Sequence, residues 1–428
     1  MVYNSLLDYS LRKFIVVLVF LSIQNLSFAS ELKEVNLEKF IEQNPSKERK
    51  EIINFITSQF NDKSVSQAQL DILWNDIETR EALHLARFQI INQKLYASGV
   101  DETYIYFKEL VRCLQRLVAK YKIEDVDFIV HTVDQLKTLD ESDHFVKKLG
   151  DIPTFMMFKN QDDKYERTRL LIPEAIILKH SWGDILAKVK AASERNDWSK
   201  KIEKIFWRGS TTGEAILPYS LNNFSKLPRL SLVMLSKLYP DIIDASFTLY
   251  VNKAFDQGDE VRRILEILFP GELRWVSEVE HIPYKYLISL DGNSCTGTRL
   301  PWIMYSNSVL VKQETNKIEW FYSALKPYVN YVPVNEKLTN IFPQFQWMKD
   351  HDNEVREISI NAHNFIANEL MPEQIEAHMV LTLNQYHQIQ QDKKLVPSVT
   401  PAEETRSFKG VAKATFARIK RNTLKSFK

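Results

Sequence analysis

The sequence predicts an α/β protein with parallel strands covered by helices. Short apolar runs alternate with helical patterns through the second half of the chain, and polar turns of small residues follow two of these runs. The runs at 286–290 and 308–311 enclose a turn at 291–297 and a helical pattern at 299–305, which together form a βαβ unit. A chain of 428 residues is long enough for two domains.

The remaining elements continue this alternation along the chain. Apolar residues at helical spacing run from about residue 37 to residue 122, and strand patterns follow at 126–133 and 154–158. A charged stretch near 192–201 predicts a domain boundary. The other predicted elements are strands at 204–207 and 242–247 and helices near 184–192, 227–238, 259–268, 338–348, 354–369 and 372–390.

The two ends of the chain have sequence patterns that can direct a protein to a membrane or to export. Residues 1–30 combine a basic start, a short apolar run and a small-residue ending, which is typical of a signal peptide; a membrane anchor or a buried helix is the alternative. Residues 393–428 form a basic tail, of which 411–428 fit a helix on an anionic membrane surface, with a solvated tail as the alternative. We therefore expect a membrane-associated or exported protein, or one at the cytoplasmic face of a membrane.

Two polar turns, at 206–213 and 291–297, are candidate phosphate sites because backbone N–H groups in such turns can hold an anion. Arg208 offers a guanidinium that grips phosphate, although a surface ion pair is the alternative, and Arg299 is the second candidate cation. Gly209 allows a close backbone approach. The other candidate residues of the two turns are Ser210, Thr211, Gly292, Asn293, Ser294, Cys295 and Thr296.

The cysteines and two acids near the turns allow more than one interpretation. Cys113 and Cys295 are the only cysteines, so a disulfide framework is excluded. Cys295 is interpreted as a small residue in a tight turn, with a reactive thiol as the alternative. Glu314 and Glu319 follow the strand at 308–311, where each could bind ribose hydroxyls or be solvated at the surface.

Five segments resemble, in the same order, one known family. They are VDFIVHTVD, FWRGSTTG, YKYLISLDGNSC, LPWIMYSNSVLVKQET and EWFYSALKPYVNYVPV, between about residues 125 and 370. The family comprises the KDEL-motif-containing-like protein O-glucosyltransferases and O-xylosyltransferases, fungal capsule-associated proteins and bacterial lipopolysaccharide-modifying glycosyltransferases. Secreted animal members carry several disulfides, so this chain is more similar to a bacterial member.

The resemblance implies a GT-B fold, in which two Rossmann-like domains face each other. We expect an N-terminal helical and acceptor-side domain at 31–195, a nucleotide-sugar domain at 196–345 and bracing helices at 346–392. The implied reaction is inverting transfer of glucose or xylose from a UDP-sugar to a hydroxyl of a surface glycan, such as lipopolysaccharide, or of a protein. No nucleic acid partner is expected, because the net charge is only +1.

The candidate catalytic base is Asp134, which follows the strand pattern at 126–133. It matches the catalytic aspartate of the family, which usually has an arginine before it and an aromatic-proline pair after it. Here Val133 and Gln135 stand beside it, so a helix cap is the alternative. His131 is a weaker candidate base and is interpreted as a core histidine.

No metal or other cofactor is expected. The triplet Asp125-Val126-Asp127 has the spacing of a metal-binding pair but precedes its strand, so we interpret it as structural. Lys204, together with the arginines of the two turns, can supply positive charge, and the sequence has no Cys/His cluster. The alternative functions are a non-catalytic glycan- or partner-binding protein that retains the fold, and a membrane scaffold recruited by the basic tail.

Overall fold

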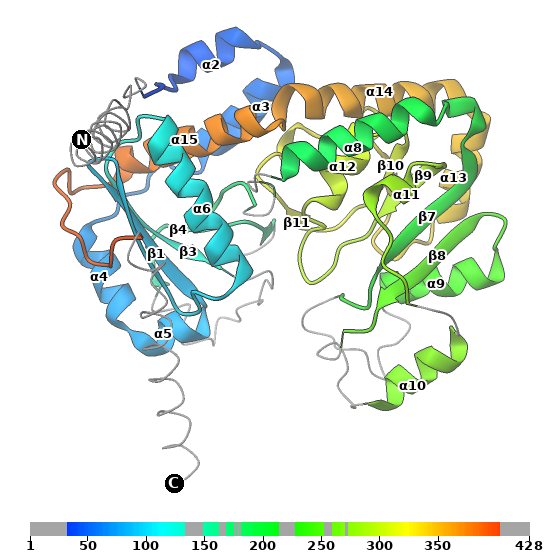
Figure 1. Ribbon diagram of the computed structural model, residues 1–428, viewed down its shortest axis with the longest axis horizontal. Coiled ribbons are helices and arrows are strands. Elements are labelled where there is room, and N and C mark those ends of the chain that lie inside the picture. The colour runs from blue at the N-terminus through cyan, green and yellow to red at the C-terminus, as the bar shows by residue number, and fades with distance from the viewer. Residues whose placement is uncertain are drawn as a thin grey trace, which may run out of the picture.

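The computed structural model describes residues 32–132, 149–161, 168–174, 177, 181–213, 227–251, 259–269 and 273–402. Figure 1 shows two sheets side by side, each flanked by helices. The predicted signal segment, Asp134 and residues 403–428 lie outside the described residues. No helix in the described parts of the chain is long and apolar enough to cross a bilayer.

The first sheet is mixed. Its strand order is β2-β1-β3-β4-β6, in which β1 is antiparallel to both neighbours, whereas β4 is parallel to β3 and β6. The strands are β1 (Leu85–Ile91), β2 (Lys94–Gly99), β3 (Val126–His131), β4 (Thr154–Met156) and β6 (Arg169–Leu171).

The hairpin of β1 and β2 shows that the prediction of a helical pattern throughout residues 37–122 is wrong between residues 85 and 99. Every residue of β1 is buried, including Arg87 and Gln89, which alternate with apolar residues. The spacing of Leu85 and Phe88 also fits a helix. Asn92 and Gln93 form the turn, with φ of 50° and 59°. Helices occupy the rest of this region: α2 (Leu37–Gln43), α3 (Lys47–Ser58), α4 (Gln67–Asn75), α5 (Ile77–Ala82) and α6 (Ile105–Lys120).

The second sheet has the order β12-β10-β9-β7-β8, and every neighbouring pair is parallel. Its strands are β7 (Ile202–Ser210), β8 (Ile243–Leu249), β9 (Tyr284–Ser289), β10 (Val309–Gln313) and β12 (Val332–Val334). The predicted βαβ unit is confirmed, because α12 (Arg299–Tyr305) connects β9 to β10. The α/β class is therefore confirmed, and the carboxyl ends of these strands meet at one edge.

Helices cover both faces of the second sheet. Phe206 of β7 joins the core shared with the first sheet, whereas Ile205 and Trp207 join a separate core with residues of α9 and α13. This alternation is what a strand between two helical layers requires. The helices of this half are α8 (Trp182–Arg195), α9 (Pro228–Leu238), α10 (Asp259–Leu268), α11 (Glu278–His281) and α13 (Ile341–Asp350), with 3-10 turns η2 (Trp198–Lys200) and η5 (Tyr322–Ala324).

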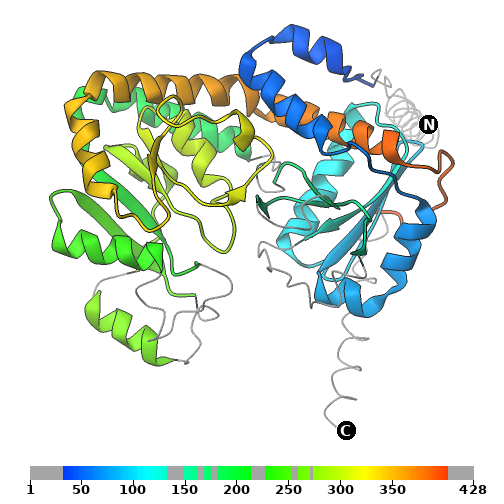
Figure 2. The same ribbon diagram turned by 180° about the vertical axis from the view of Figure 1, so that it is seen from behind.

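The C-terminal helices return to the first sheet, as the resemblance implied. Figure 2 shows α14 (Asp352–Glu369) and α15 (Pro372–Ile389) continuing from the second sheet to the first. Tyr386 of α15 packs 5.0 Å from Phe155 and 6.2 Å from Phe128, measured between ring centroids. Arg49 of α3 donates to Glu369 of α14 at 2.9 Å, in a buried ion pair. These helices therefore contact residues of both halves of the chain.

A small two-stranded sheet also joins the two halves. β5 (Lys159–Asn160) pairs antiparallel with β11 (Lys317–Ile318). The backbone N–H of Gln161 donates to the carbonyl of Asn316 at 2.6 Å. The first half of the chain is therefore hydrogen-bonded to the segment that follows β10.

Candidate functional site

The two predicted turns meet at the carboxyl edge of the second sheet, with one correction to their limits. The sequence predicted a turn over residues 206–213, but β7 extends to Ser210, so the turn begins at Thr211. Its neighbour at residues 291–297 follows β9. A Cβ added to Gly292 would lie 3.2 Å from the Thr212 hydroxyl, so the two turns are in direct contact.

Arg229 holds these turns together, and the sequence analysis did not single it out. Its guanidinium donates to the carbonyls of Ser210, Leu290 and Asp291 at 3.0–3.1 Å, and also to the Thr212 hydroxyl. A Cβ at Gly292 would lie 2.8 Å from the guanidinium, which explains the glycine. Arg229 lies in the first turn of α9, where the helix dipole disfavours a cation. This unfavourable position is the feature of the sequence that could have identified Arg229 as a functional candidate.

Arg299 is the first residue of α12, and its positive charge at this edge is available to a ligand. Its guanidinium makes no hydrogen bond or ion pair with any residue that the structure describes, and lies 5.9 Å from the Trp207 ring. Burial, followed by repulsion from the Arg229 guanidinium, lowers the pKa of Arg299 to about 9. The side chain is therefore still charged at neutral pH, but in a position that disfavours its charge. An anion bound there would relieve this cost.

Arg208 is committed to an ion pair, which is the alternative that the sequence left open. Its guanidinium donates to the Asp244 carboxylate at 2.6 Å and to the Asp244 carbonyl at 2.9 Å, and it stacks 4.3 Å above the Phe206 ring. The Tyr284 hydroxyl donates to the other carboxylate oxygen of Asp244 at 2.6 Å. The structure thus directs the Arg208 side chain towards Asp244 of β8.

His281 lies between these cations and was also missed. Burial and the Arg299 and Arg208 guanidiniums lower the pKa of His281 to about 4, so the ring is neutral at pH 7. Its Nδ1–H donates to the Ser277 carbonyl at 2.7 Å, and the ring packs edge-on against Phe206. A buried neutral histidine between two arginines adds no repulsion to the cationic edge.

The small residues after Arg208 mainly determine the path of the backbone in this turn. A Cβ at Gly209 would lie 2.4 Å from the Trp207 ring, so packing against this tryptophan requires the glycine. The Thr211 hydroxyl accepts from the Val251 N–H at 2.9 Å and is fully buried. The Ser210 hydroxyl lies 3.1 Å from that of Thr212. These contacts fix the turn beside β8.

The turn after β9 is held by its own hydrogen bonds. The Gly292 N–H donates to the Ser294 carbonyl at 3.0 Å, and the Ser289 hydroxyl donates to that of Thr296 at 2.9 Å. The Asn293 side chain is half-buried and makes no hydrogen bond with a described residue. Burial, with the nearby Asp291 carboxylate, raises the pKa of Cys295 well above its ordinary value. Its thiol is therefore protonated, which supports the structural interpretation.

Acidic side chains from both halves of the chain lie beside this turn. Gly297 has φ of +56°, and a Cβ there would lie 2.8 Å from the Glu174 carboxylate of the first half. Glu319 is 1% exposed, so surface solvation is wrong for this residue. Burial and the Glu174 carboxylate raise the pKa of Glu319 well above its ordinary range. Glu314, by contrast, is exposed and lies 3.4 Å from the Lys312 ammonium.

Other charged candidates have structural roles. Lys204 lies near the amino end of β7, where it donates to the Pro240 carbonyl, so its charge is not at the carboxyl edge. Asp127 is buried in a two-point ion pair with Arg87, at 2.8 and 2.6 Å, which confirms its structural interpretation. Among the described residues, no group of His, Cys, Asp or Glu side chains is placed to hold a metal ion.

The carboxyl end of β3 leads to the predicted base, which lies outside the described residues. His131 is buried, with its Nε2 3.0 Å from the Thr154 hydroxyl, and burial lowers its pKa to about 3. It is a core histidine, as predicted. Thr132 is the last described residue before Asp134, and its hydroxyl donates to the His84 carbonyl at 2.9 Å.

Glycine turns, and a guanidinium with no partner among the described residues, at the carboxyl edge of a parallel sheet are features of α/β proteins that bind ligands at this edge. The sequence profile of glycosyl transferase family 90 matches residues 69–408. Because this match covers most of the chain, the protein belongs to glycosyl transferase family 90.

Individual relatives are protein O-glucosyltransferases. The chain is 31% identical over 199 residues to protein O-glucosyltransferase 2 of Danio rerio, covering 46% of this chain and 35% of that protein. It is 29% identical over 199 residues to protein O-glucosyltransferase 3 of Mus musculus, covering 46% and 35%. It is 28% identical over 189 residues to protein O-glucosyltransferase 1 of Homo sapiens, covering 44% and 43%. The matched segments thus span less than half the length of these relatives.

Proposed function

We propose that this protein is an inverting glycosyltransferase that moves glucose or xylose from a UDP-sugar to a hydroxyl group. The acceptor is a protein or a surface glycan such as lipopolysaccharide. Membership of glycosyl transferase family 90 and the similarity to protein O-glucosyltransferases support sugar transfer. The observation that carries the donor site is the guanidinium of Arg299, which has no partner in the described part of the chain and lies near that of Arg229.

The arginine pair suits the departing nucleoside diphosphate. Negative charge builds on the diphosphate as the bond to the sugar breaks, and fixed positive groups stabilise it most where water is scarce. Arg299 is partly buried and remains protonated at neutral pH, because its pKa is about 9. Arg229 keeps the two turns in place while adding positive potential. Direct contact with Arg299 therefore stabilises part of the negative charge on the leaving group, and the proposed reaction needs no metal ion.

The catalytic base in this proposal is Asp134. It lies two residues beyond Thr132, which is the last described residue after β3. A carboxylate there removes the acceptor proton as the hydroxyl attacks the anomeric carbon, and the single displacement inverts that centre. A GT-B arrangement brings this group opposite the donor. Two separate sheets, joined through β5, β11 and the C-terminal helices, support that arrangement.

Release of UDP from UDP-glucose tests the proposal. Asp134→Asn should lower the release rate by about 100-fold or more, because general base catalysis contributes about 10²–10⁴-fold, and should leave UDP binding unchanged. Asp151→Asn is the matched control, since Asp151 is exposed. Tight UDP-sugar binding without release, in the presence of protein and glycan acceptors, would instead identify a non-catalytic binding protein.

We also infer that the ends of the chain bring the enzyme to a membrane, on its cytoplasmic face or after export. The basic sequence of residues 411–428 supports this placement. Deleting these residues should reduce co-sedimentation with anionic vesicles while leaving UDP release unchanged. Equal sedimentation of both proteins would contradict the role of the tail.

A further inference from the structure

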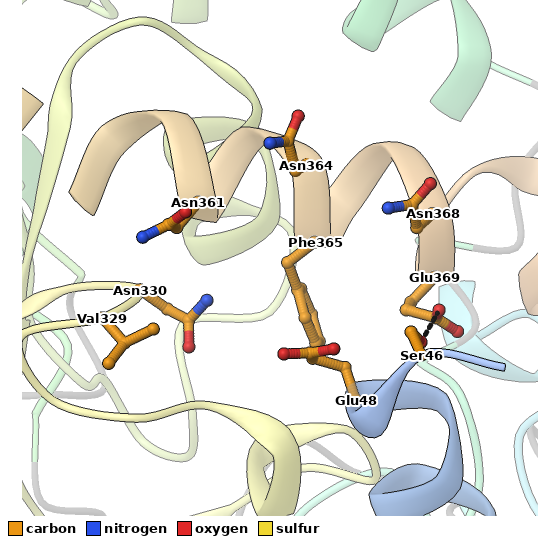
Figure 3. A pocket seen from close by; sticks show the side chains of 9 residues that line it. All are labelled: Ser46, Glu48, Val329, Asn330, Asn361, Asn364, Phe365, Asn368 and Glu369. Atoms are coloured by element: carbon orange, nitrogen blue, oxygen red, sulfur yellow. Dashed lines mark hydrogen bonds between the residues drawn. The ribbon is translucent and has the colours of Figure 1, made fainter. Parts of the chain in front are cut away.

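A pocket of about 190 Å³ lies between α3, the loop before β12 and the C-terminal half of α14 (Figure 3). The loop precedes β12, which runs parallel to β10 and, through it, to β9. The pocket is therefore near the amino edge of the second sheet, whereas the turn at residues 291–297 is at the carboxyl edge. The proposed donor site does not include it.

Asparagine amides dominate the polar lining. Asn361, Asn364 and Asn368 recur at intervals of three and four residues, which places them on one face of α14. All three are exposed, and their side-chain amides make no hydrogen bond with a described residue. Each amide can donate through nitrogen and accept through oxygen at the same time. Adjacent hydroxyl groups on a sugar ring need this pairing of donors and acceptors.

Asn330 adds a fixed donor from the opposite wall. It is 4% exposed, and its Oδ1 accepts from the Lys326 N–H at 3.0 Å, which sets the orientation of the amide. Figure 3 shows its nitrogen directed towards the interior of the pocket. That nitrogen makes no hydrogen bond with a described residue, so it is available to a ligand. A ligand oxygen inside the pocket would satisfy it.

The base of the pocket is built independently of any ligand. Glu369 is fully buried and accepts hydrogen bonds from Asn44, Ser46 and Arg49 at 2.9–3.1 Å. Its acceptor capacity is therefore largely used by the protein. The Phe365 ring forms an apolar wall between the amides. The cavity shape is thus fixed by contacts between α3 and α14.

The charge of the lining identifies the class of ligand. Glu48 contributes a half-buried carboxylate, and none of the described residues that line the pocket is a lysine or an arginine. Such a lining repels phosphates and carboxylates and suits a neutral polyhydroxyl compound. The volume corresponds to about six waters at about 30 Å³ each, which is the size of one sugar ring.

We propose that this pocket binds one neutral hexopyranose unit of a glycan, outside the reaction centre. The sugar hydroxyls bond to the asparagine amides and to the Glu48 carboxylate, and the ring packs against Phe365. Such a site would hold a glycan on the protein while another sugar of the same glycan, or another acceptor molecule, reacts at the donor site.

Ligand-observed saturation-transfer NMR with methyl glucopyranoside, on the full chain with its donor site filled by UDP, tests this site. Wild type should show saturable binding, and Asn361→Ala/Asn364→Ala should weaken it by about tenfold, the equivalent of about 1.4 kcal/mol. Asn330→Asp keeps the acceptor for Lys326 but removes the inward N–H group, so it should also weaken binding. Asn353→Ala is the matched control, because Asn353 is exposed on α14 and does not line the pocket.

Absence of saturation transfer to wild type, or equal binding by wild type and the double variant, would overturn the proposal. Thermal melting of each variant verifies folding, and UDP affinity is measured by calorimetry on the same samples. The hexose site fails if methyl glucopyranoside does not bind while UDP does. The donor site fails if UDP does not bind while methyl glucopyranoside does. The two failures can therefore be distinguished.

Discussion

Arg299→Met should stabilise the ligand-free protein and weaken nucleotide binding. The pKa of Arg299 is lowered to about 9, and each tenfold loss of proton affinity corresponds to about 1.4 kcal/mol. The full shift therefore represents several kcal/mol against the charged form. Partial solvent access reduces this figure, so we expect a gain of about 1–2 kcal/mol in the free energy of unfolding. Each charged hydrogen bond removed should cost about 1.5–3 kcal/mol of the binding free energy of the diphosphate. This corresponds to a roughly 10–150-fold loss of affinity.

Urea unfolding measures the first effect, and calorimetric titration with UDP measures the second. Arg274→Met is the matched control, because Arg274 is exposed and pairs with Glu280 on the surface. The control should leave both quantities within about 0.5 kcal/mol of wild type. An Arg299→Met protein that is less stable and binds UDP normally would refute the reasoning, because it would make Arg299 a structural cation.

The pH dependence of stability in wild type and Arg299→Met tests whether the pKa of Arg299 is lowered in the folded protein. The folded guanidinium of Arg299 loses its proton near pH 9, whereas the unfolded one keeps it to higher pH. The unfolded state then binds more protons, so wild-type stability should rise relative to Arg299→Met above about pH 9. Parallel stability curves for the two proteins between pH 8 and pH 10 would contradict the lowered pKa.

Three further predictions concern buried groups. Burial lowers the pKa of Lys201 to about 7, so wild-type stability should rise with pH above about 7, more steeply than in Lys201→Met; equal slopes in thermal melting would contradict this. Glu369→Gln leaves the buried Arg49 without its counter-ion and should cost about 3–5 kcal/mol in urea unfolding, whereas a loss below about 1 kcal/mol would exclude a buried ion pair. Gly297→Ala should cost about 1–2 kcal/mol through its left-handed backbone alone, with added repulsion from Glu174, and an unchanged melting temperature would contradict the close contact.

The sequence predicted the second sheet well because its patterns are local. The strand before residue 291, the turn and the helix from Arg299 to Tyr305 follow one another without interruption, so periodicity and turn chemistry mark each limit. The hairpin of β1 and β2 was missed because the alternation of Arg87 and Gln89 with apolar residues is short, and Leu85 and Phe88 also have helical spacing. Helical and extended patterns are then indistinguishable over so short a run.

The candidate site was predicted only in part, because its contacts are long-range. Residues of both turns were identified from their types, but Arg229 reaches them from a different helix, and sequence spacing does not report such a contact. Arg208 has the chemistry of a phosphate ligand, yet its partner Asp244 lies 36 residues away on β8. The raised pKa of Glu319 likewise depends in part on Glu174 from the other half of the chain.

A crystal structure of the protein with UDP tests the central claim most directly. The account predicts diphosphate oxygens within hydrogen-bond distance of the Arg299 guanidinium, above the turn that Gly292 and Asn293 form. A diphosphate bound elsewhere on the protein, with the Arg299 side chain still without a partner, would contradict it.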